Sequence, residues 1–175
     1  MPEPFQPLCF GYYHADATSP EVAFETLKVD RSTIPVLPKD GILLIDDSED
    51  DAELSLRALC AAGLQVPIAW IGDSTSAIDA LESATPQSLP RLVLLDLRMP
   101  CIDGFETLRR MRDNPRTRAL SVIVMVGSAR APELPRCYSL GANSYVVKPL
   151  RRDSFFAACA RAALEWPRNN LSDDA

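Results

Sequence analysis

Three aspartates and one lysine stand out because each lies at the end of a short apolar run. Asp46 and Asp47 follow the first run, Asp96 follows the third and Lys148 follows the fifth. Neighbouring carboxylates repel each other unless a cation lies between them. None of the candidate ligands is a histidine or a cysteine, and hard carboxylate oxygens favour Mg²⁺ or Mn²⁺ over zinc. The sequence therefore predicts a divalent-cation site that faces an ammonium group.

From residue 40 onward, short apolar runs alternate with segments of helical spacing. This alternation predicts an α/β fold, with a doubly wound parallel sheet, right-handed crossovers and helices on both faces. Such sheets bind ligands at the carboxyl ends of their strands. We therefore expect the three aspartates and Lys148 to meet at one edge of the sheet. The expected strands are residues 42–45, 66–71, 92–95, 122–126 and 145–147.

The first 39 residues differ in composition from the rest. They hold six of the fifteen prolines, and proline cannot donate a backbone hydrogen bond. We interpret residues 1–39 as a proline-rich, irregular N-terminal arm, with room for one short amphipathic helix over residues 20–29. The arm is either a tail packed on the domain or a docking or dimerisation segment. The main domain is expected over residues 40–167, and a polar C-terminal tail over residues 168–175.

Composition excludes several classes of function. The net charge of −6 is opposite to that of a basic nucleic-acid-binding domain. No apolar run approaches the ~20 residues of a membrane span, and the chain begins with no targeting segment, so we expect a cytoplasmic protein without a membrane partner. Five widely spaced cysteines without a C-x-x-C pair argue against disulfides and zinc. Glycine-rich nucleotide motifs and the G-x-S-x-G nucleophile elbow are absent.

Three segments carry a resemblance to a known family. They are the Asp46-Asp47 pair, residues 94–104 around Asp96, and residues 140–149. Over most of the main domain, the chain resembles the receiver domain of two-component response regulators. The resemblance implies a flavodoxin-like five-stranded parallel sheet with strand order 2-1-3-4-5.

The resemblance also implies a role for each candidate site residue. Asp96 would accept a phosphoryl group from the phosphohistidine of a histidine kinase. The three aspartates and the backbone carbonyl of Arg98 would hold Mg²⁺ (or Mn²⁺), and Lys148 and Gly127 would lie against the phosphoryl oxygens. Phosphoryl transfer of this kind depends on positioning and charge neutralisation. Four further residues are expected to shape the site: Met99, Pro100, Gly104 and Pro149.

One position departs from the family pattern. Receivers carry Thr or Ser at the end of the fourth strand, where the hydroxyl binds the phosphoryl group and moves on activation. The usual spacing, 30 residues after Asp96 and 22 before Lys148, falls on Val126, which has no hydroxyl. A slip of the strand end would bring Ser128 there instead. Tyr145 matches the aromatic residue that rotates inward in receivers, so Val126 and Tyr145 are the two switch positions.

Two functions remain open at this point. In the first, the chain is a stand-alone receiver, not an enzyme, which a sensor histidine kinase phosphorylates on Asp96 and which signals by contact with a downstream protein or phosphotransfer partner. Only eleven residues follow Leu164, too few for a DNA-binding module. In the second, the chain is a degenerate receiver, a phosphorylation-insensitive interaction module, because Val126 replaces the switch hydroxyl.

Two further expectations concern partners and chemistry. The tract that ends at residues 164–167 is similar to single-domain receivers paired with phytochrome kinases, which often dimerise. A phytochrome is therefore a candidate kinase, and a homodimer would form through the fourth helix, fifth strand and fifth helix, or through the N-terminal arm. A phosphatase with an aspartate nucleophile is a remote alternative, since Arg98 stands where such enzymes place an acid.

Overall fold

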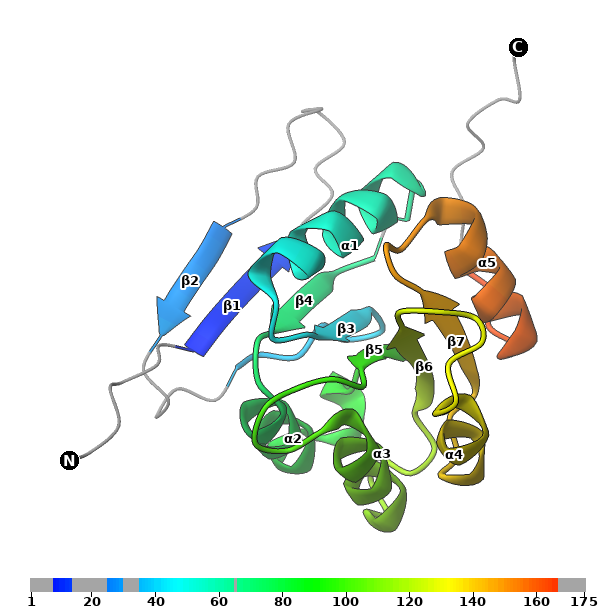
Figure 1. Ribbon diagram of the computed structural model, residues 1–175. Helices are drawn as coiled ribbons and strands as arrows, with labels where there is room; N and C mark the ends of the chain where they lie inside the picture. Colours follow the sequence, from blue (N-terminus) through cyan, green and yellow to red (C-terminus); the bar gives the residue numbers. More distant parts are fainter. Residues whose placement is uncertain (1–7, 14–24, 30–34, 65, 167–175) are drawn as a thin grey trace, which may run out of the picture.

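A seven-stranded sheet runs through the centre of the protein (Figure 1). The computed structural model describes residues 8–13, 25–29, 35–64 and 66–166. The strands are β1 Leu8–Tyr13, β2 Glu25–Val29, β3 Ile42–Ile45, β4 Ile68–Ile71, β5 Leu92–Asp96, β6 Ser121–Val126 and β7 Ser144–Val147. The helices are α1 Glu49–Ala61, α2 Ser74–Ser83, α3 Gly104–Asp113, α4 Leu134–Ser139 and α5 Arg152–Arg161, with a 3₁₀ turn η1 at Pro86–Ser88.

The five central strands are parallel and confirm the expected topology. Their order is β4-β3-β5-β6-β7, which is 2-1-3-4-5 when they are counted along the chain. Leu43 pairs with Ala69 on one side and Val93 on the other, so β3 lies between β4 and β5. The observed bounds differ from the expected ones by at most two residues, because β4 begins at Ile68 and β5 extends to Asp96.

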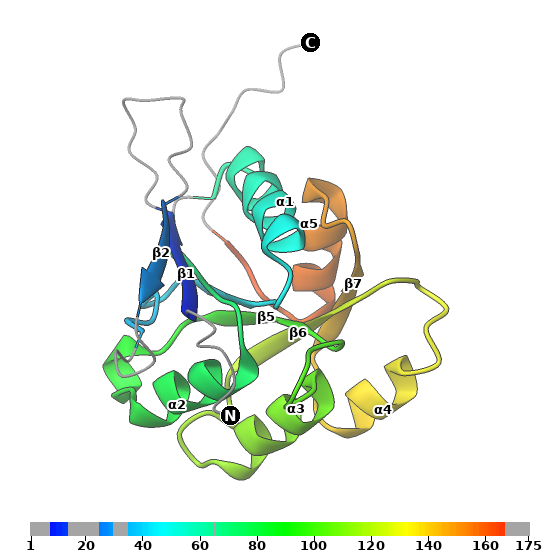
Figure 2. The same ribbon diagram turned by 60° about the vertical axis from the view of Figure 1, so that its left-hand side comes forward.

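Helices cover both faces of the sheet, which explains the continuous apolar runs of the strands. Leu43 and Ile45 point to the layer of α2, α3 and α4, whereas Ile42 and Leu44 point to the layer of α1 and α5. Figure 2 shows these two layers on opposite sides of the strands. None of these helices is long and apolar enough to cross a membrane, within the ranges given above.

The N-terminal segment differs from its prediction. Residues 8–13 and 25–29 form strands, and β1 pairs antiparallel with both β2 and β4. The expected irregular arm is therefore wrong over both stretches, and the expected helix is wrong over residues 25–29. Aromatic and β-branched residues favour strands, and the edge of β4 offers unpaired backbone groups. The prolines of this segment lie outside both strands, and residues 20–24 and 168–175 lie outside the described ranges.

Candidate functional site

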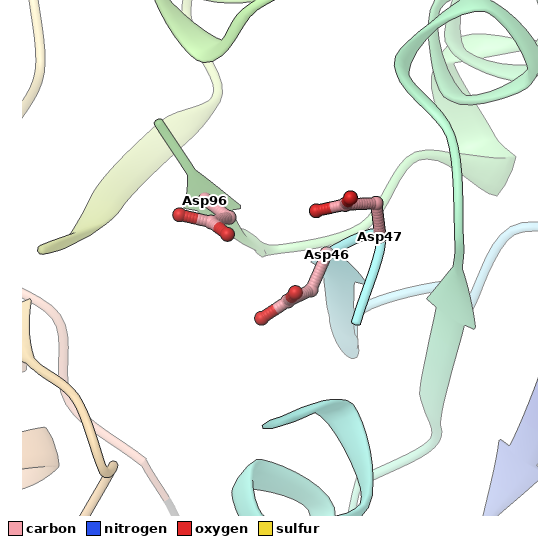
Figure 3. Close-up of side chains that lie close together, drawn as sticks. All are labelled: Asp46, Asp47 and Asp96. Carbon is pink, nitrogen blue, oxygen red and sulfur yellow. The ribbon is translucent and has the colours of Figure 1, made fainter. Parts of the chain in front are cut away.

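The three predicted aspartates meet at the carboxyl edge of the parallel sheet. Asp46 and Asp47 directly follow β3, and Asp96 is the last residue of β5. One carboxylate oxygen from each lies within 4.8 Å of the others, and Figure 3 shows the three side chains together. Asp46 is fully buried and Asp96 nearly so, whereas Asp47 is exposed. The strand ends thus bring together residues that lie 50 positions apart in the sequence.

Lys148 reaches this group from the end of β7. Its Nζ lies 2.7 Å from Asp46 Oδ2 and 2.9 Å from Asp96 Oδ2. A fourth carboxylate, Asp51 in the first turn of α1, contacts Nζ at 3.0 Å. Asp51 was not singled out from the sequence, although it belongs to the acidic run after β3. We call Asp46, Asp47, Asp96 and Lys148 the acidic cluster. The peptide bond from Lys148 to Pro149 is cis.

Charge balance in the acidic cluster favours a bound cation. Burial raises the pKa of Asp46 to about 6, although Lys148 partly offsets this effect. Burial also raises the pKa of Asp47. Burial opposes the charged form of Lys148, but its hydrogen bonds to Asp46 and Asp96 outweigh that effect and raise its pKa. A charged ammonium thus faces several carboxylates, whose remaining negative charge and hard oxygens suit Mg²⁺ or Mn²⁺.

Local hydrogen bonds fix Asp46 at the end of its strand. Its Oδ1 accepts from the Ser48 backbone N–H at 3.0 Å. Ser48 also caps α1, because its hydroxyl accepts from Asp51 N, and N-cap serines stabilise helix starts. The backbone carbonyl of Asp46 accepts from the Trp70 indole N–H at 2.7 Å. None of these three contacts was predicted, since Ser48 and Trp70 both fit ordinary structural roles in the sequence.

The loop from β5 to α3 shapes the other side of the site. Arg98 N donates to Asp96 Oδ1 at 3.2 Å. Gly104 is required by close approach, because an added Cβ would lie 2.4 Å from the Asp96 carbonyl oxygen. Met99 is buried, and its sulfur accepts from the Ser74 hydroxyl at 3.5 Å. Pro100 is exposed beside it. These contacts anchor the phosphoacceptor candidate to α2 and α3.

An open cavity of about 620 Å³ lies beside Asp96. Gly127 lines it, and a Cβ added there would meet no atom within 4 Å, so the space beside Gly127 is open. Arg98 and Glu133 also line it, and their side chains approach to 3.5 Å. The remaining lining residues include Asp47, Asp51, Val126, Ser128, Arg130 and Lys148.

The two switch positions lie where the spacing predicted them. Val126 is the last residue of β6 and pairs in register with Val147, so the strand end has not slipped to Ser128. Val126 is buried and offers the cavity no donor. Tyr145 is half-buried on β7, and Arg161 of α5 covers its ring at 5.1 Å and donates to its carbonyl oxygen at 2.7 Å. Arg161 was not predicted as part of this region.

Comparison with known proteins shows which family the chain belongs to. The family model of the response regulator receiver domain matches residues 42–160. The chain belongs to this family. Among curated relatives, the receiver is 41% identical over 111 residues to a protein from Methanothrix harundinacea described as "Probable methanogenesis regulatory protein FilR2", covering 62% of this chain and 72% of that protein.

Solved structures with the same fold include two bacteriophytochrome response regulators. The receiver is 33% identical to AtBRR, with a TM-score of 0.67 and coverage of 78% of this chain and 99% of that one. The Mn²⁺-bound form of Rcp1 is 27% identical, with a TM-score of 0.58 and coverage of 74% and 99%. Other relatives are longer, since the receiver spans 50% of PhoB from Rhizobium meliloti and 24% of PleD from Caulobacter vibrioides.

Proposed function

We propose that this receiver accepts a phosphoryl group on Asp96 from the phosphohistidine of a sensor histidine kinase. Transfer would break the N–P bond of the phosphohistidine and form an O–P bond to the Asp96 carboxylate, while the released imidazole nitrogen takes up a proton. The observation that carries this proposal is the position of Asp96, which is anchored by Arg98 N and Lys148 and borders an open cavity. A carboxylate is a competent acceptor once its charge is offset.

In this proposal, Asp46, Asp47, Asp96 and the Arg98 carbonyl hold a divalent cation. The excess of carboxylates over ammonium groups supports it, as does the Mn²⁺-bound form of the related Rcp1. When bound, the cation neutralises charge on the phosphoryl oxygens. Lys148 would pair with one of these oxygens, and Gly127 would leave room for them. Met99, Pro100, Gly104 and Pro149 would keep the surrounding loops in place.

The output would be contact with another protein rather than turnover of a substrate. The likeness to AtBRR and RtBRR favours a phytochrome-type kinase as the phosphoryl donor. Tyr138 leaves an exposed aromatic ring on α4, which supports the α4-β7-α5 face as the contact surface for a downstream protein, a phosphotransfer partner or a second copy. The N-terminal strands are the second candidate surface for a homodimer. Cys101, Cys137 and Cys159 carry free thiols, which suits the reducing cytoplasm.

Val126 favours a second candidate function, an interaction module that phosphorylation does not switch. A hydrogen bond to a charged group is typically worth ~1.5–3 kcal/mol, and Val126 cannot supply it to the phosphoryl group. The acidic cluster would then be chemically competent, while the link from Asp96 to Tyr145 would be missing. The two candidates share the phosphoryl chemistry and differ in its consequence.

The shared chemistry is tested by incubation with acetyl phosphate and Mg²⁺, followed by intact-mass measurement. The wild type should gain one phosphoryl group, and Asp96→Asn should gain none. Asp50→Asn is the matched control, because Asp50 is exposed in the same region and lies outside the acidic cluster. Equal uptake by Asp96→Asn would show that the acceptor assignment is wrong. Rapid multiple turnover of phosphomonoesters would instead indicate a phosphatase.

A further inference from the structure

Trp70 makes a buried contact with the backbone of a proposed cation ligand. Its side chain is 1% exposed and that of Asp46 is fully buried. The indole Nε1–H donates to the Asp46 carbonyl oxygen at 2.7 Å. This is a short hydrogen bond between two fully desolvated groups, and buried polar groups of this kind are costly to leave unpaired.

The position of Asp46 explains why its carbonyl needs a side-chain partner. The register of β3 with β4 ends at the pair Ile45 and Ile71. Asp46 still donates its N–H to the Ile71 carbonyl, at 3.3 Å. Its own carbonyl lies beyond the paired residues, and Trp70, one residue before Ile71, supplies the donor. The indole hydrogen bond thus extends the connection between β3 and β4 by one residue, to Asp46, whose carboxylate is a proposed cation ligand.

The remaining contacts of Asp46 hold its carboxylate rather than its peptide group. Oδ1 accepts from Ser48 N at 3.0 Å, and Oδ2 lies 2.7 Å from Lys148 Nζ. Ser48 follows Asp46 closely in the chain and would move with it. Lys148 is itself shared with Asp96 and Asp51. The Asp46 backbone is thus tied to β4 by its own N–H to Ile71 and, at the shorter distance, by the rigid buried side chain of Trp70.

We propose that Trp70 is a positioning residue for the divalent cation. Its indole N–H fixes the Asp46 peptide group and so holds the Asp46 carboxylate at the distance from Asp47 and Asp96 that the cation requires. The inference rests on the proposed function, since it assumes that the acidic cluster binds Mg²⁺. Groups that orient metal ligands commonly change metal affinity by ~10–100-fold when they are removed.

The chain contains a matched control for this role. Trp166 is its only other tryptophan and is also buried in the layer of α1 and α5. Arg91 directly precedes β5, and its guanidinium stacks on the Trp166 ring at 5.0 Å. Trp166 therefore lies at the opposite end of β5 from Asp96. Replacement of either indole by phenylalanine changes a buried aromatic ring in the same layer, but of the two tryptophans only Trp70 contacts the acidic cluster.

The first experiment removes the N–H while keeping the shape of the ring. In a Trp166→Phe background, biosynthetic replacement of tryptophan by benzothienylalanine puts sulfur in place of the Trp70 nitrogen. Mg²⁺ affinity, measured by calorimetry, should fall about tenfold relative to the Trp166→Phe protein that carries ordinary tryptophan. Trp70→Phe should show a similar loss, and Trp166→Phe alone should bind as the wild type does.

A second readout uses the unmodified protein and does not depend on a folded variant. Mg²⁺ titration should shift the indole ¹⁵N–¹H resonance of Trp70, with the dissociation constant seen by calorimetry, and leave that of Trp166 in place. Unchanged Mg²⁺ affinity in the sulfur-substituted protein, or a Trp70 resonance that does not move, would overturn the inference. Absence of Mg²⁺ binding by the wild type would instead overturn the proposed function on which it rests.

Discussion

The acidic cluster and the switch positions belong to the same sheet, with Val126 at the end of β6 and Tyr145 inside β7, opposite Val124. They differ in how fully they match the family pattern. The cluster has every charged group that the family pattern requires, and Lys148 contacts two of its carboxylates within 3 Å. At the switch positions, Val126 has an apolar side chain where a hydroxyl is usual, and Arg161 covers Tyr145. We therefore propose that the receiver keeps the phosphoryl chemistry and that the change at Val126 affects its transmission.

The difference also separates two kinds of physical requirement. In the proposed function, phosphoryl acceptance requires charge neutralisation, which Lys148 and the cation held by the three aspartates would supply. In the family pattern that we expect here, transmission would depend on one hydrogen bond from a hydroxyl to the phosphoryl group. Valine at position 126 would remove that bond and leave the acidic cluster in place, because valine fills nearly the same space as threonine.

Lys148→Met should have the largest effect on the acidic cluster. The change leaves Asp46 and Asp96 without their counter-charge, and loss of one partner of a buried ion pair costs on the order of 3 kcal/mol of unfolding free energy. Phosphoryl uptake from acetyl phosphate should fall about a hundredfold or more. Urea unfolding and intact mass measure the two effects. Lys148→Arg keeps the charge as a control, and uptake by Lys148→Met within threefold of wild type would contradict the assigned role.

The pH dependence of stability should report the burial of Asp46. Its pKa is about 6 in the folded protein against an ordinary 3.8, so the folded state binds this proton more tightly. Without Mg²⁺, the stability associated with the protonated form is present below pH 3.8 and is lost as the pH rises to about 6, by on the order of 3 kcal/mol. Asp46→Asn lacks the titrating carboxyl, so this pH dependence should be absent from the unfolding free energy of the variant.

The same pair of proteins tests cation binding. Above pH 6, Mg²⁺ should raise the unfolding free energy of the wild type, because it binds the folded state alone. Asp46→Asn should gain little from Mg²⁺ at that pH. Urea titrations at pH 5 and 7.5, with Mg²⁺ or EDTA, measure all four conditions. A slope that survives in Asp46→Asn would assign the pH dependence to another group.

Val126→Thr should have a smaller effect, confined to transmission. The threonine hydroxyl would add a hydrogen bond to a charged phosphoryl analogue, which shifts the activation equilibrium about tenfold or more. With beryllofluoride and Mg²⁺, the aromatic NMR signals of Tyr145 should move in Val126→Thr and stay nearly fixed in the wild type. Val126→Ala, which adds no donor, should behave as the wild type. An equal response of Tyr145 in all three proteins would show that transmission does not need the hydroxyl.

Deletion of residues 1–38 should have the smallest effect on the acidic cluster. We propose residues 40–167 as the receiver unit, and β1 and β2 add to the outer edge of β4, away from β5 and β7. The shortened protein should fold and bind Mg²⁺ within threefold of the wild type, although with lower stability because the edge of β4 is exposed. Calorimetry and circular dichroism measure both properties. An unfolded product would show that the N-terminal strands belong to the core.

The central fold and the acidic cluster could be predicted because both depend on strand ends. Runs such as 42–45 and 92–95 have to be covered on both faces, and the residues after them must lie at one edge. Asp46, Asp96 and Lys148 therefore came together as expected. The N-terminal strands β1 and β2 were not predicted. Proline density dominated the interpretation, whereas the strands occupy the stretches between the prolines.

Two contacts of the acidic cluster depend on three-dimensional detail that spacing does not contain. Asp51 reaches Lys148 because α1 starts at Glu49 with a fixed direction set by its Ser48 cap. Trp70 belongs to an apolar run and is buried like its neighbours, so nothing in the pattern indicates that its N–H faces the Asp46 carbonyl.

Binding of beryllofluoride tests the central claim most directly, namely that the acidic cluster remains competent although the switch position has changed. We expect ¹⁹F NMR of the wild type with Mg²⁺ to show a bound beryllofluoride resonance that disappears with EDTA and is absent in Asp96→Asn. The same resonance should be present in Val126→Thr and in the wild type alike. A wild type that shows no bound resonance, while Val126→Thr shows one, would contradict the claim that the two regions are separable.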